Sequence, residues 1–242
     1  MDKGMEIDDI LQEFEEKSKE QNIRSSKFQD DNIYNSLIAA MLNERMSPEI
    51  LPYQKDLMRK VLEHLSNQQQ YLLDSHEYGD LNLESGIVSG DFKLQLMIME
   101  TDIERVNYLV RLYLRTRLSK LDKFTLHYIN ETSKESSPLL SEEEKDYMHK
   151  HFKILTELYN NCFLKKMPEY LTYLDDTSGG KSMISIPDLN VPVFIKSVSK
   201  EPIIIHSNDD NDDDLEIVLN GIYVVKYSLV KKYIELGDIV LI

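Results

Sequence analysis

The chain has 242 residues, and 43 acidic residues against 28 Lys and Arg give it a formal net charge of -15. Its hydrophobic content of 41% is enough for a folded protein with one large domain or two small ones. A chain this acidic is repelled by the phosphate backbone of DNA unless its cations gather on one face, so the composition disfavours a free-standing DNA-binding protein and fits partners with basic surfaces.

A short apolar pattern lies near the N-terminus. It contains four residues at the spacing of one helical face: Ile7, Ile10, Leu11 and Phe14. Asp8 and Asp9 stand in the first turn, where the helix dipole favours anions, while residues 17–31 are polar and lack periodicity. Because so short a helix is marginal alone in water, we predict over residues 1–20 a docking helix on a flexible tether that folds on a partner. A first helix of the globular domain is the alternative.

Helical patterns dominate from about residue 32 to residue 170. We predict four long helices, over residues 32–46, 53–76, 92–128 and 141–167. The stretch 78–91 contains three glycines and is predicted to be a loop. The fourth helix begins with a capping box, in which Ser141 caps free N–H groups and Glu144 reaches back. Together these helices form an all-α domain over residues 30–172.

The third predicted helix carries many cations for so acidic a chain: Arg111, Arg115, Arg117, Lys120 and Lys123. On a helical wheel they spread around the helix, whereas a helix that binds a nucleic-acid groove needs them together. Arg117 projects into the middle of the apolar face, where an unpaired charge costs several kcal/mol. We therefore expect it to pair with a carboxylate of this domain or of a neighbouring subunit, an ordinary surface position being the alternative. The residues assigned to this buried ion pair or subunit interface are Tyr113, Arg115, Arg117, Leu118, Leu121 and Phe124.

After residue 172 the pattern changes. Residues 173–185 form a turn-rich linker, and residues 186–242 contain β-branched runs separated by turn residues, which predicts a small β-rich domain. We expect strands near residues 191–198, 202–206, 215–230 and 238–242. A module of this size buries only about 60% of its surface and is marginal by itself. The predicted fold class is α+β, with an N-terminal all-α domain followed by a small C-terminal β-rich domain.

The last residues are strongly apolar, and an exposed segment of this kind would form a sticky edge. We therefore expect this segment to be buried against the β-rich domain or another subunit. The residues expected to be buried are Tyr227, Ile239, Leu241 and Ile242.

No sequence motif supports catalysis or cofactor binding. The GGKS tetrapeptide at 179–182 lacks the first glycine of a phosphate-binding loop, since Asp175 stands there. The acidic run 208–214 lacks the glycine and the bidentate glutamate of a calcium loop and is predicted to be a hairpin loop. His149 and His151 point to different helix faces, which disfavours zinc. We therefore predict no catalytic residue, no cofactor and no metal ion.

The single cysteine, Cys162, rules out an internal disulfide and lies on an apolar helical face, where a small core residue is expected. The N-terminus lacks the basic and apolar regions of a signal peptide, and no segment has the roughly 18 uninterrupted apolar residues of a membrane span. These features predict a soluble, intracellular protein.

Five segments together resemble a known family. They are MLNERMSPEIL (41–51), YLRTRLSKLDKF (113–124), LSEEEKDYMHKHF (140–152), PDLNVPVFIKSV (187–198) and VVKYSLVKKYIELGDIVLI (224–242). In this order they resemble the SLD5-type subunits of GINS, the four-subunit assembly of eukaryotic DNA replication. The start IDDILQEF (7–14) further resembles yeast members, whose N-terminal helix docks on a trimeric hub that links the helicase to DNA polymerase alpha.

The resemblance implies a nuclear, non-enzymatic scaffold with a helical domain followed by a small β domain. GINS joins the MCM ring and the Cdc45 protein in the replicative helicase. The implied partners are therefore three paralogous GINS subunits, MCM, Cdc45 and the trimeric hub, with DNA contact weak or indirect. Under this resemblance the hub-docking residues are Ile7, Asp8, Asp9, Ile10, Leu11 and Phe14.

Three alternatives remain open. The paralogous Psf1-type subunit has the same helical-then-β order, although the closing GDIVLI and the PDLNVPVF strand favour the SLD5 type. A nucleic-acid-binding module would use residues 111–123, and its affinity would fall steeply with salt. A nucleotide-dependent enzyme would have to use the GGKS tetrapeptide.

Overall fold

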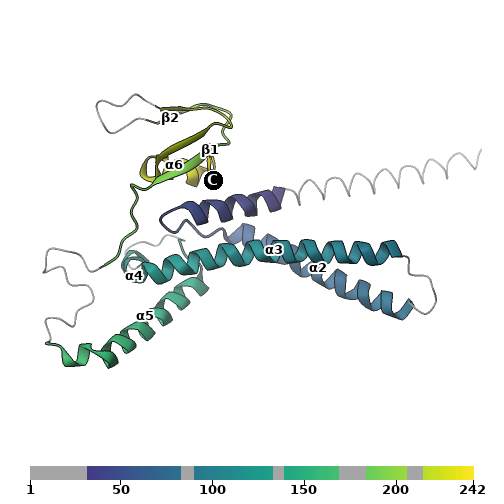
Figure 1. Ribbon diagram of the computed structural model, residues 1–242, viewed down its shortest axis with the longest axis horizontal. Coiled ribbons are helices and arrows are strands. Elements are labelled where there is room, and N and C mark those ends of the chain that lie inside the picture. The colour runs from purple at the N-terminus through teal and green to yellow at the C-terminus, as the bar shows by residue number, and fades with distance from the viewer. Residues whose placement is uncertain (1–31, 83–89, 133–138, 169–183, 206–214) are drawn as a thin grey trace, which may run out of the picture. The chain divides into compact units, whose positions relative to one another are not determined.

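The computed structural model describes residues 32–82, 90–132, 139–168, 184–205 and 215–242 (Figure 1). The N-terminal part contains a helix over residues 32–46, then α2 (Lys55–Asn82), α3 (Gly90–Lys123), α4 (Thr125–Thr132), α5 (Glu142–Cys162) and the short 3-10 helix η1 (Leu164–Lys166). The C-terminal part contains β1 (Pro192–Ser197), β2 (Ile203–Ile205), β3 (Leu215–Ile217), β4 (Ile222–Lys226), α6 (Tyr227–Leu236) and β5 (Ile239–Leu241). The predicted fold class, a helical domain followed by a small β domain, is confirmed. In the described part of the chain, none of the helices has the length and apolar content that crossing a bilayer requires.

Contacts within the chain divide it into two units. The first comprises Met1–Ile38 and Asp56–Val106, and the second comprises Ala39–Lys55 and Asn107–Ile242. The boundary crosses α3, whose N-terminal half belongs to the first unit and whose C-terminal half belongs to the second. The division therefore differs from the order of helical and β segments along the sequence, because one long helix contributes to both units.

The apolar face of α2 is buried in the first unit. Met58, Val61 and Leu65 recur at three- and four-residue spacing and are buried, while residues between them on the other face are exposed. Leu37 of the helix over residues 32–46 and Leu96 of α3 are buried as well. Each of the three helical segments of this unit therefore contributes an apolar stripe to it.

The loop predicted over residues 78–91 is wrong at both ends, and Gly90 and Asp91 already belong to α3. Residues 78–82 continue α2, so Gly79 lies inside a helix. Glycine costs about 1 kcal/mol relative to alanine in a helix interior, a penalty small enough for the rest of a 28-residue helix to offset. Residues 83–89 lie outside the described part of the chain.

The single helix predicted over residues 92–128 is two helices, because α3 ends at Lys123 and α4 begins at Thr125. The Thr125 hydroxyl donates to the backbone carbonyls of Leu121 and Asp122 at 2.6 and 3.2 Å. Thr116 makes the same kind of bond to Leu112 inside α3, where the helix continues, so the hydroxyl bond alone does not account for the break.

A second apolar cluster lies among the helices of the second unit. Its buried members are Ile50, Leu121, Phe124, Tyr128, Leu140 and Met148. The hydroxyl of Tyr128 also accepts a hydrogen bond from the backbone N–H of Ile50 at 2.9 Å. The cluster thus joins the loop before α2 to α3, α4 and the start of α5.

The C-terminal part is built on β1. It is the central strand of an antiparallel sheet with the order β4-β1-β5, and β2 and β3 form a separate antiparallel pair. Along β1 buried and exposed residues alternate, so Val193, Ile195 and Ser197 face the interior and the others face outward. The hairpin loop predicted over residues 208–214 lies outside the described part of the chain.

The strand predicted over residues 215–230 is wrong at its end, where α6 begins at Tyr227. Tyr227, Val230 and Ile234 are buried at the spacing of a helical face, a period that the high β-branched content of the segment obscured. Gly237 ends this helix in the left-handed region, with φ of 85°.

Candidate functional site

Arg117 of α3 is the centre of a buried network of charges in the second unit. Its side chain is 0% exposed. Nε and Nη2 donate to the two carboxylate oxygens of Glu144 at 2.6 and 3.0 Å, and Nη1 donates to Glu44 at 2.9 Å. Nη1 and Nη2 also donate to the backbone carbonyls of Leu51 and Leu139. The guanidinium thus has two carboxylate partners, which offset the cost of burying its charge.

Lys120, one turn further along α3, binds the same Glu44 carboxylate. Its Nζ donates to Oε1 of Glu44 at 2.8 Å, to the Ser47 hydroxyl at 2.8 Å, and to the backbone carbonyls of Glu49 and Glu44. Burial lowers the pKa of Lys120, and the charge of Glu44 beside it offsets this effect in part. Glu44 therefore bridges two cations.

Helix ends position both carboxylates. Glu44 lies in the last turn of the helix over residues 32–46, and Glu144 lies in the first turn of α5. The predicted capping box is confirmed, because Ser141 Oγ accepts from the backbone N–H of Glu144 at 3.2 Å and the Ser141 N–H donates to the Glu144 carboxylate at 3.0 Å. Glu144 thus caps α5 and pairs with Arg117, which ties the start of α5 to α3.

Two tyrosine rings flank the guanidinium of Arg117. The ring centroids of Tyr53 and Tyr113 lie 5.3 and 5.6 Å from its central carbon, within the range of cation–π attraction. Burial raises the pKa of Tyr113 to about 12, and the nearby Arg117 only partly opposes this rise. The Tyr113 phenol is therefore neutral at physiological pH, and the negative charge around Arg117 comes from the two glutamates.

The loop after the first described helix joins this network to the β domain within the second unit. Leu51, whose carbonyl accepts from Arg117, packs against the apolar core of the β domain. The Glu49 carboxylate accepts from the Tyr227 hydroxyl at 2.9 Å and pairs with Lys231 of α6 at 2.7 Å. The same short loop therefore contacts the charged network on one side and α6 on the other.

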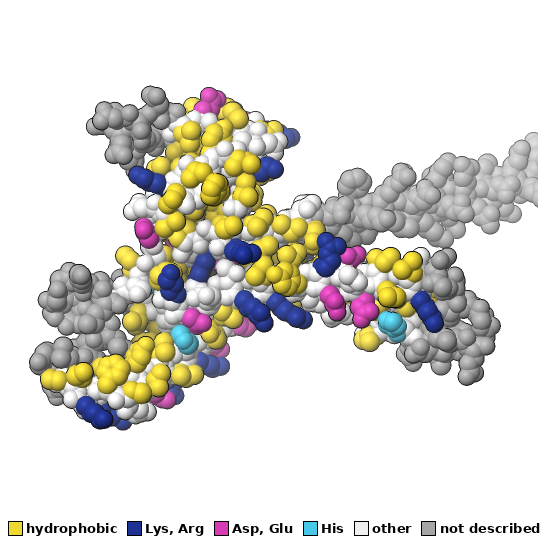
Figure 2. All heavy atoms as spheres, in the orientation of Figure 1, with side chains coloured by type: hydrophobic (Ala, Val, Ile, Leu, Met, Phe, Trp, Pro, Cys, Tyr) yellow, Lys and Arg dark blue, Asp and Glu magenta, His cyan; other side chains and the backbone are white. Residues whose placement is uncertain are grey.

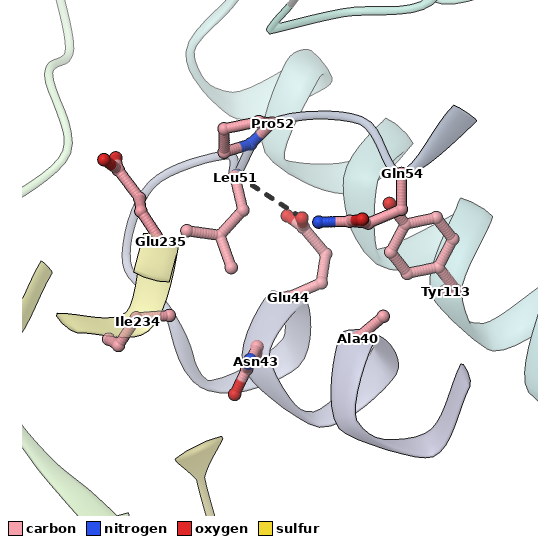
Figure 3. A pocket seen from close by; sticks show the side chains of 9 residues that line it. All are labelled: Ala40, Asn43, Glu44, Leu51, Pro52, Gln54, Tyr113, Ile234 and Glu235. Atoms are coloured by element: carbon pink, nitrogen blue, oxygen red, sulfur yellow. Dashed lines mark hydrogen bonds between the residues drawn. The ribbon is translucent and has the colours of Figure 1, made fainter. Parts of the chain in front are cut away.

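A cavity of about 120 Å³ lies beside this loop (Figure 3). Ile234 and Glu235 of α6 line one side of it. The other lining residues are Ala40, Asn43, Glu44, Leu51, Pro52, Gln54 and Tyr113. The Glu44 carboxylate at its wall already accepts from the Leu51 backbone, as the dashed line in Figure 3 shows, and from the two cations. A carboxylate with this many donors is not available as a general base. No cluster of three metal-binding side chains was found among the described residues.

The residues of α3 that the sequence analysis assigned to an ion pair or interface are mostly internal. Tyr113, Leu121 and Phe124 are buried within this chain, and Leu118 packs against the second apolar cluster. The buried side chains of Tyr113, Leu121 and Phe124 are therefore not available to a neighbouring subunit, while Leu118 is only partly buried. Arg115 is exposed, because it lies off the apolar face, and it takes no part in the buried network.

Three of the four residues predicted to be buried near residue 242 are buried within this chain, and burial of the fourth, Ile242, against another subunit stays a prediction. Tyr227, Ile239 and Leu241 are fully buried in the β domain, and the Leu241 N–H donates to the side chain of Asn43 at 2.8 Å. Ile242 is 41% exposed, since it follows β5 on the outward side of the alternation that buries Ile239 and Leu241. The proposed hub-docking residues between positions 7 and 14 lie outside the described part of the chain.

The sequence analysis missed an exposed apolar stripe on α5. Tyr147, Ile154 and Leu158 are 36%, 63% and 51% exposed and recur at the spacing of one helical face. Figure 2 shows hydrophobic side chains gathered along this helix, at the lower left. Cys162, expected in the core, is exposed as well. A signal for this stripe is present in the sequence. The apolar residues of α5 extend around more of the helix circumference than the face that contains the buried residues Glu144 and Met148.

Both parts of the chain match known domains. Residues 24–163 match the GINS complex protein helical bundle domain, and residues 187–242 match the C-terminus of the DNA replication complex GINS protein SLD5. The second match favours the SLD5 type over the paralogous Psf1 type.

Yeast proteins are similar over most or all of their length. The DNA replication complex GINS protein SLD5 of Debaryomyces hansenii is 70% identical over 251 residues, covering 100% of both chains. The protein of the same name from Yarrowia lipolytica is 34% identical, over 85% of this chain and 75% of its own. That of Saccharomyces cerevisiae is 32% identical, over 86% of this chain and 80% of its own.

Replacing Arg117 tests the buried network. We expect Arg117→Met to lower the free energy of unfolding by about 3–5 kcal/mol, because it leaves the buried Glu144 carboxylate without its cation and removes one of the two cations that bind Glu44. The matched control is Arg115→Met on the same helix, which removes an exposed charge and should change stability by less than about 0.5 kcal/mol. Urea unfolding followed by circular dichroism measures both, and equal effects of the two changes would contradict the network's role.

Alkaline pH tests the burial of Tyr113. An unfolded tyrosine loses its proton near pH 10, while the folded chain holds the Tyr113 proton to about pH 12. The contribution of protonated Tyr113 to the free energy of unfolding is therefore fully present below pH 10. It is lost as the pH rises from 10 through 12, which lowers the free energy of unfolding by about 2–3 kcal/mol. Tyr113→Phe keeps the ring beside Arg117 and should lose less stability between pH 9 and 12 than the native chain. Identical pH profiles in thermal melts would show that Tyr113 is not buried.

Proposed function

Because this chain belongs to the SLD5 family of GINS complex subunits, we propose that it is a scaffold whose exposed apolar surfaces are covered by the other subunits of that complex. SLD5 is a non-catalytic structural subunit, and the GINS complex acts in DNA replication. Other GINS subunits are therefore partners of this chain, and the proposal concerns which of its surfaces they cover.

The exposed stripe of α5 carries the proposal. Ile154 and Leu158 leave more than half of their surface in water, although burying each one would contribute about 1.5–3 kcal/mol. Aligned side chains of this kind on one face of a helix form the pattern that packs against another amphipathic helix. A helix of a paralogous subunit is the partner that this surface fits.

The outer face of the sheet supports the same interpretation. Phe194 of β1 and Val224 of β4 are paired directly across the two strands and are 59% and 57% exposed. Ile222, next on the same face of β4, is exposed as well. An exposed apolar sheet face is a typical protein-binding surface, and we assign it to a second contact within the complex.

The finer assignments follow from the family. We propose that the complex containing this chain joins the MCM ring and the Cdc45 protein in the replicative helicase during initiation and elongation, which places the chain in the nucleus. We also propose that Ile7, Asp8, Asp9, Ile10, Leu11 and Phe14 dock on the trimeric hub that links the helicase to DNA polymerase alpha. Their amphipathic spacing supports this second proposal.

Two of the five cations that a nucleic-acid-binding module would use are bound to internal groups of the chain. Arg117 and Lys120 donate to internal carboxylates and carbonyls, so they are not available to phosphates. Arg111, Arg115 and Lys123 remain exposed on the same helix. Three cations on a chain of net charge -15 support at most weak binding at physiological salt.

Charge placed in the α5 stripe should block assembly. We expect Ile154→Asp with Leu158→Asp to prevent co-purification with the other GINS subunits, because two carboxylates would be buried without partners at the interface. Both positions are exposed within this chain, so its own fold should persist. Co-expression followed by size-exclusion chromatography measures the effect.

The matched control for this experiment is Lys153→Asp. Lys153 is exposed on α5 away from the stripe, and its replacement changes the net charge by the same amount as the double change. The control should assemble normally. Normal assembly of the double variant would instead show that the stripe is not an interface.

Hub docking has its own test. Leu11→Ala with Phe14→Ala removes up to about 2–3 kcal/mol of burial at each position, enough to abolish a micromolar contact. We expect loss of binding to the isolated trimeric hub, measured by calorimetry, while the GINS complex itself assembles normally. Gln12→Ala with Glu15→Ala, on other faces of the same predicted helix, should bind as the native chain does. Retained binding by the first variant would contradict the docking role.

A further inference from the structure

The first unit contains an apolar groove that its own packing leaves unfilled. The groove has a volume of about 350 Å³. Its apolar walls are Ile33 and Leu37 of the helix over residues 32–46, Val61 and Leu65 of α2, and Val106 of α3. A volume at the lower end of the range of ligand-binding pockets accommodates a few apolar side chains. The groove thus fits one apolar face of a short helix.

Polar residues on α2 form one rim of this groove. His64 and Gln68 line it one turn apart. Lys60 lies a further turn toward the start of α2, is exposed, and extends the same row. Asp102 of α3 lies on the opposite side and is paired with Arg105 at 3.3 Å. Lys60 is therefore an exposed cation beside the groove, within one helical turn of the rim residue His64.

The N-terminal residues of this chain have the matching pattern. The apolar stripe of residues 7–14 spans about two helical turns. Residues 6–16 contain six acidic residues and no Lys or Arg, namely Glu6, Asp8, Asp9, Glu13, Glu15 and Glu16. The apolar face of this segment matches the apolar walls of the groove, and its carboxylates are opposite in charge to the exposed Lys60 beside the groove.

Chain connectivity favours this occupant over a separate partner. The groove begins at Ile33, and the eighteen residues 15–32 separate it from the apolar stripe. A segment of that length reaches up to about 55 Å, so it is long enough to return the stripe to the groove. Closing such a loop costs little, and the effective concentration of the tethered segment is on the order of millimolar.

We propose that residues 7–14 occupy this groove as a short helix when no external partner holds them. The same apolar stripe then serves two competing sites, the groove and the hub. This regulatory role rests on the proposed hub docking, whereas occupancy of the groove does not. If about 90% of the chains are closed, hub binding is weakened about tenfold, because only the open fraction is competent.

Photo-crosslinking in the assembled complex, without the hub, tests the contact directly. The photoreactive residue p-benzoylphenylalanine replaces Phe14 in one variant and Gln12, on the opposite face of the predicted helix, in another. We expect the position-14 probe to crosslink to residues 61–68 of α2 or to Val106, and the position-12 probe to give at most about one tenth of that yield. Position-14 crosslinks only to other subunits, or only outside the groove, would overturn the proposal.

A rim variant gives the second readout. Lys60→Glu should lower the position-14 crosslink yield about fivefold and strengthen hub binding of the native segment, by up to about tenfold when the groove is fully vacated. Lys93→Glu, an exposed charge reversal on α3 nine residues before the nearest groove-lining residue of that helix, Asp102, should change neither. Equal effects of the two reversals would overturn the proposal.

The two proposals fail separately. Crosslinks in the groove together with hub binding that is unaffected by Leu11→Ala and Phe14→Ala would overturn hub docking and leave the groove contact in place. Hub binding that depends on these residues, with no crosslink in the groove, would overturn the groove contact alone.

Discussion

The second unit depends on one buried guanidinium. Arg117 pairs with Glu44, which is 73 residues away along the chain, and with Glu144, which is 27 residues away. Because a buried charge without its partners costs several kcal/mol, the segments that carry these carboxylates have to be in place together. The network therefore links the end of the first described helix, the start of α5, and the loop whose Leu51 packs on the β domain.

The surface of the chain differs from this charged interior because it is partly apolar. The buried charges pair with one another, while apolar side chains such as Ile154, Leu158 and Phe194 are exposed to water at the surface. A structural subunit needs both properties, because a well-defined interior presents apolar surfaces in a constant arrangement and the partners remove those surfaces from water. The groove of the first unit extends this idea, since the chain itself contains a segment that matches it.

Sequence patterns predicted the features that depend on near neighbours. The helix over residues 32–46 and the capping box of Ser141 and Glu144 follow from periodicity and end signals within a few residues. The patterns failed where two tendencies compete. The segment after Tyr227 has β-branched residues at helical spacing, and the continuous helical pattern over residues 92–128 is divided between α3 and α4. In the first case packing decided between alternatives that the composition left nearly equal.

The sequence by itself determined the order of the domains, the helical periods, and the requirement that an arginine on an apolar face have a carboxylate partner. Only the tertiary structure selected Glu44 and Glu144 from 43 acidic residues, and only it showed which apolar faces the chain covers and which it leaves exposed. The physical reason is that burial and charge pairing depend on neighbours from distant segments. Periodicity along one helix records that a face is apolar but contains no information on what lies against it.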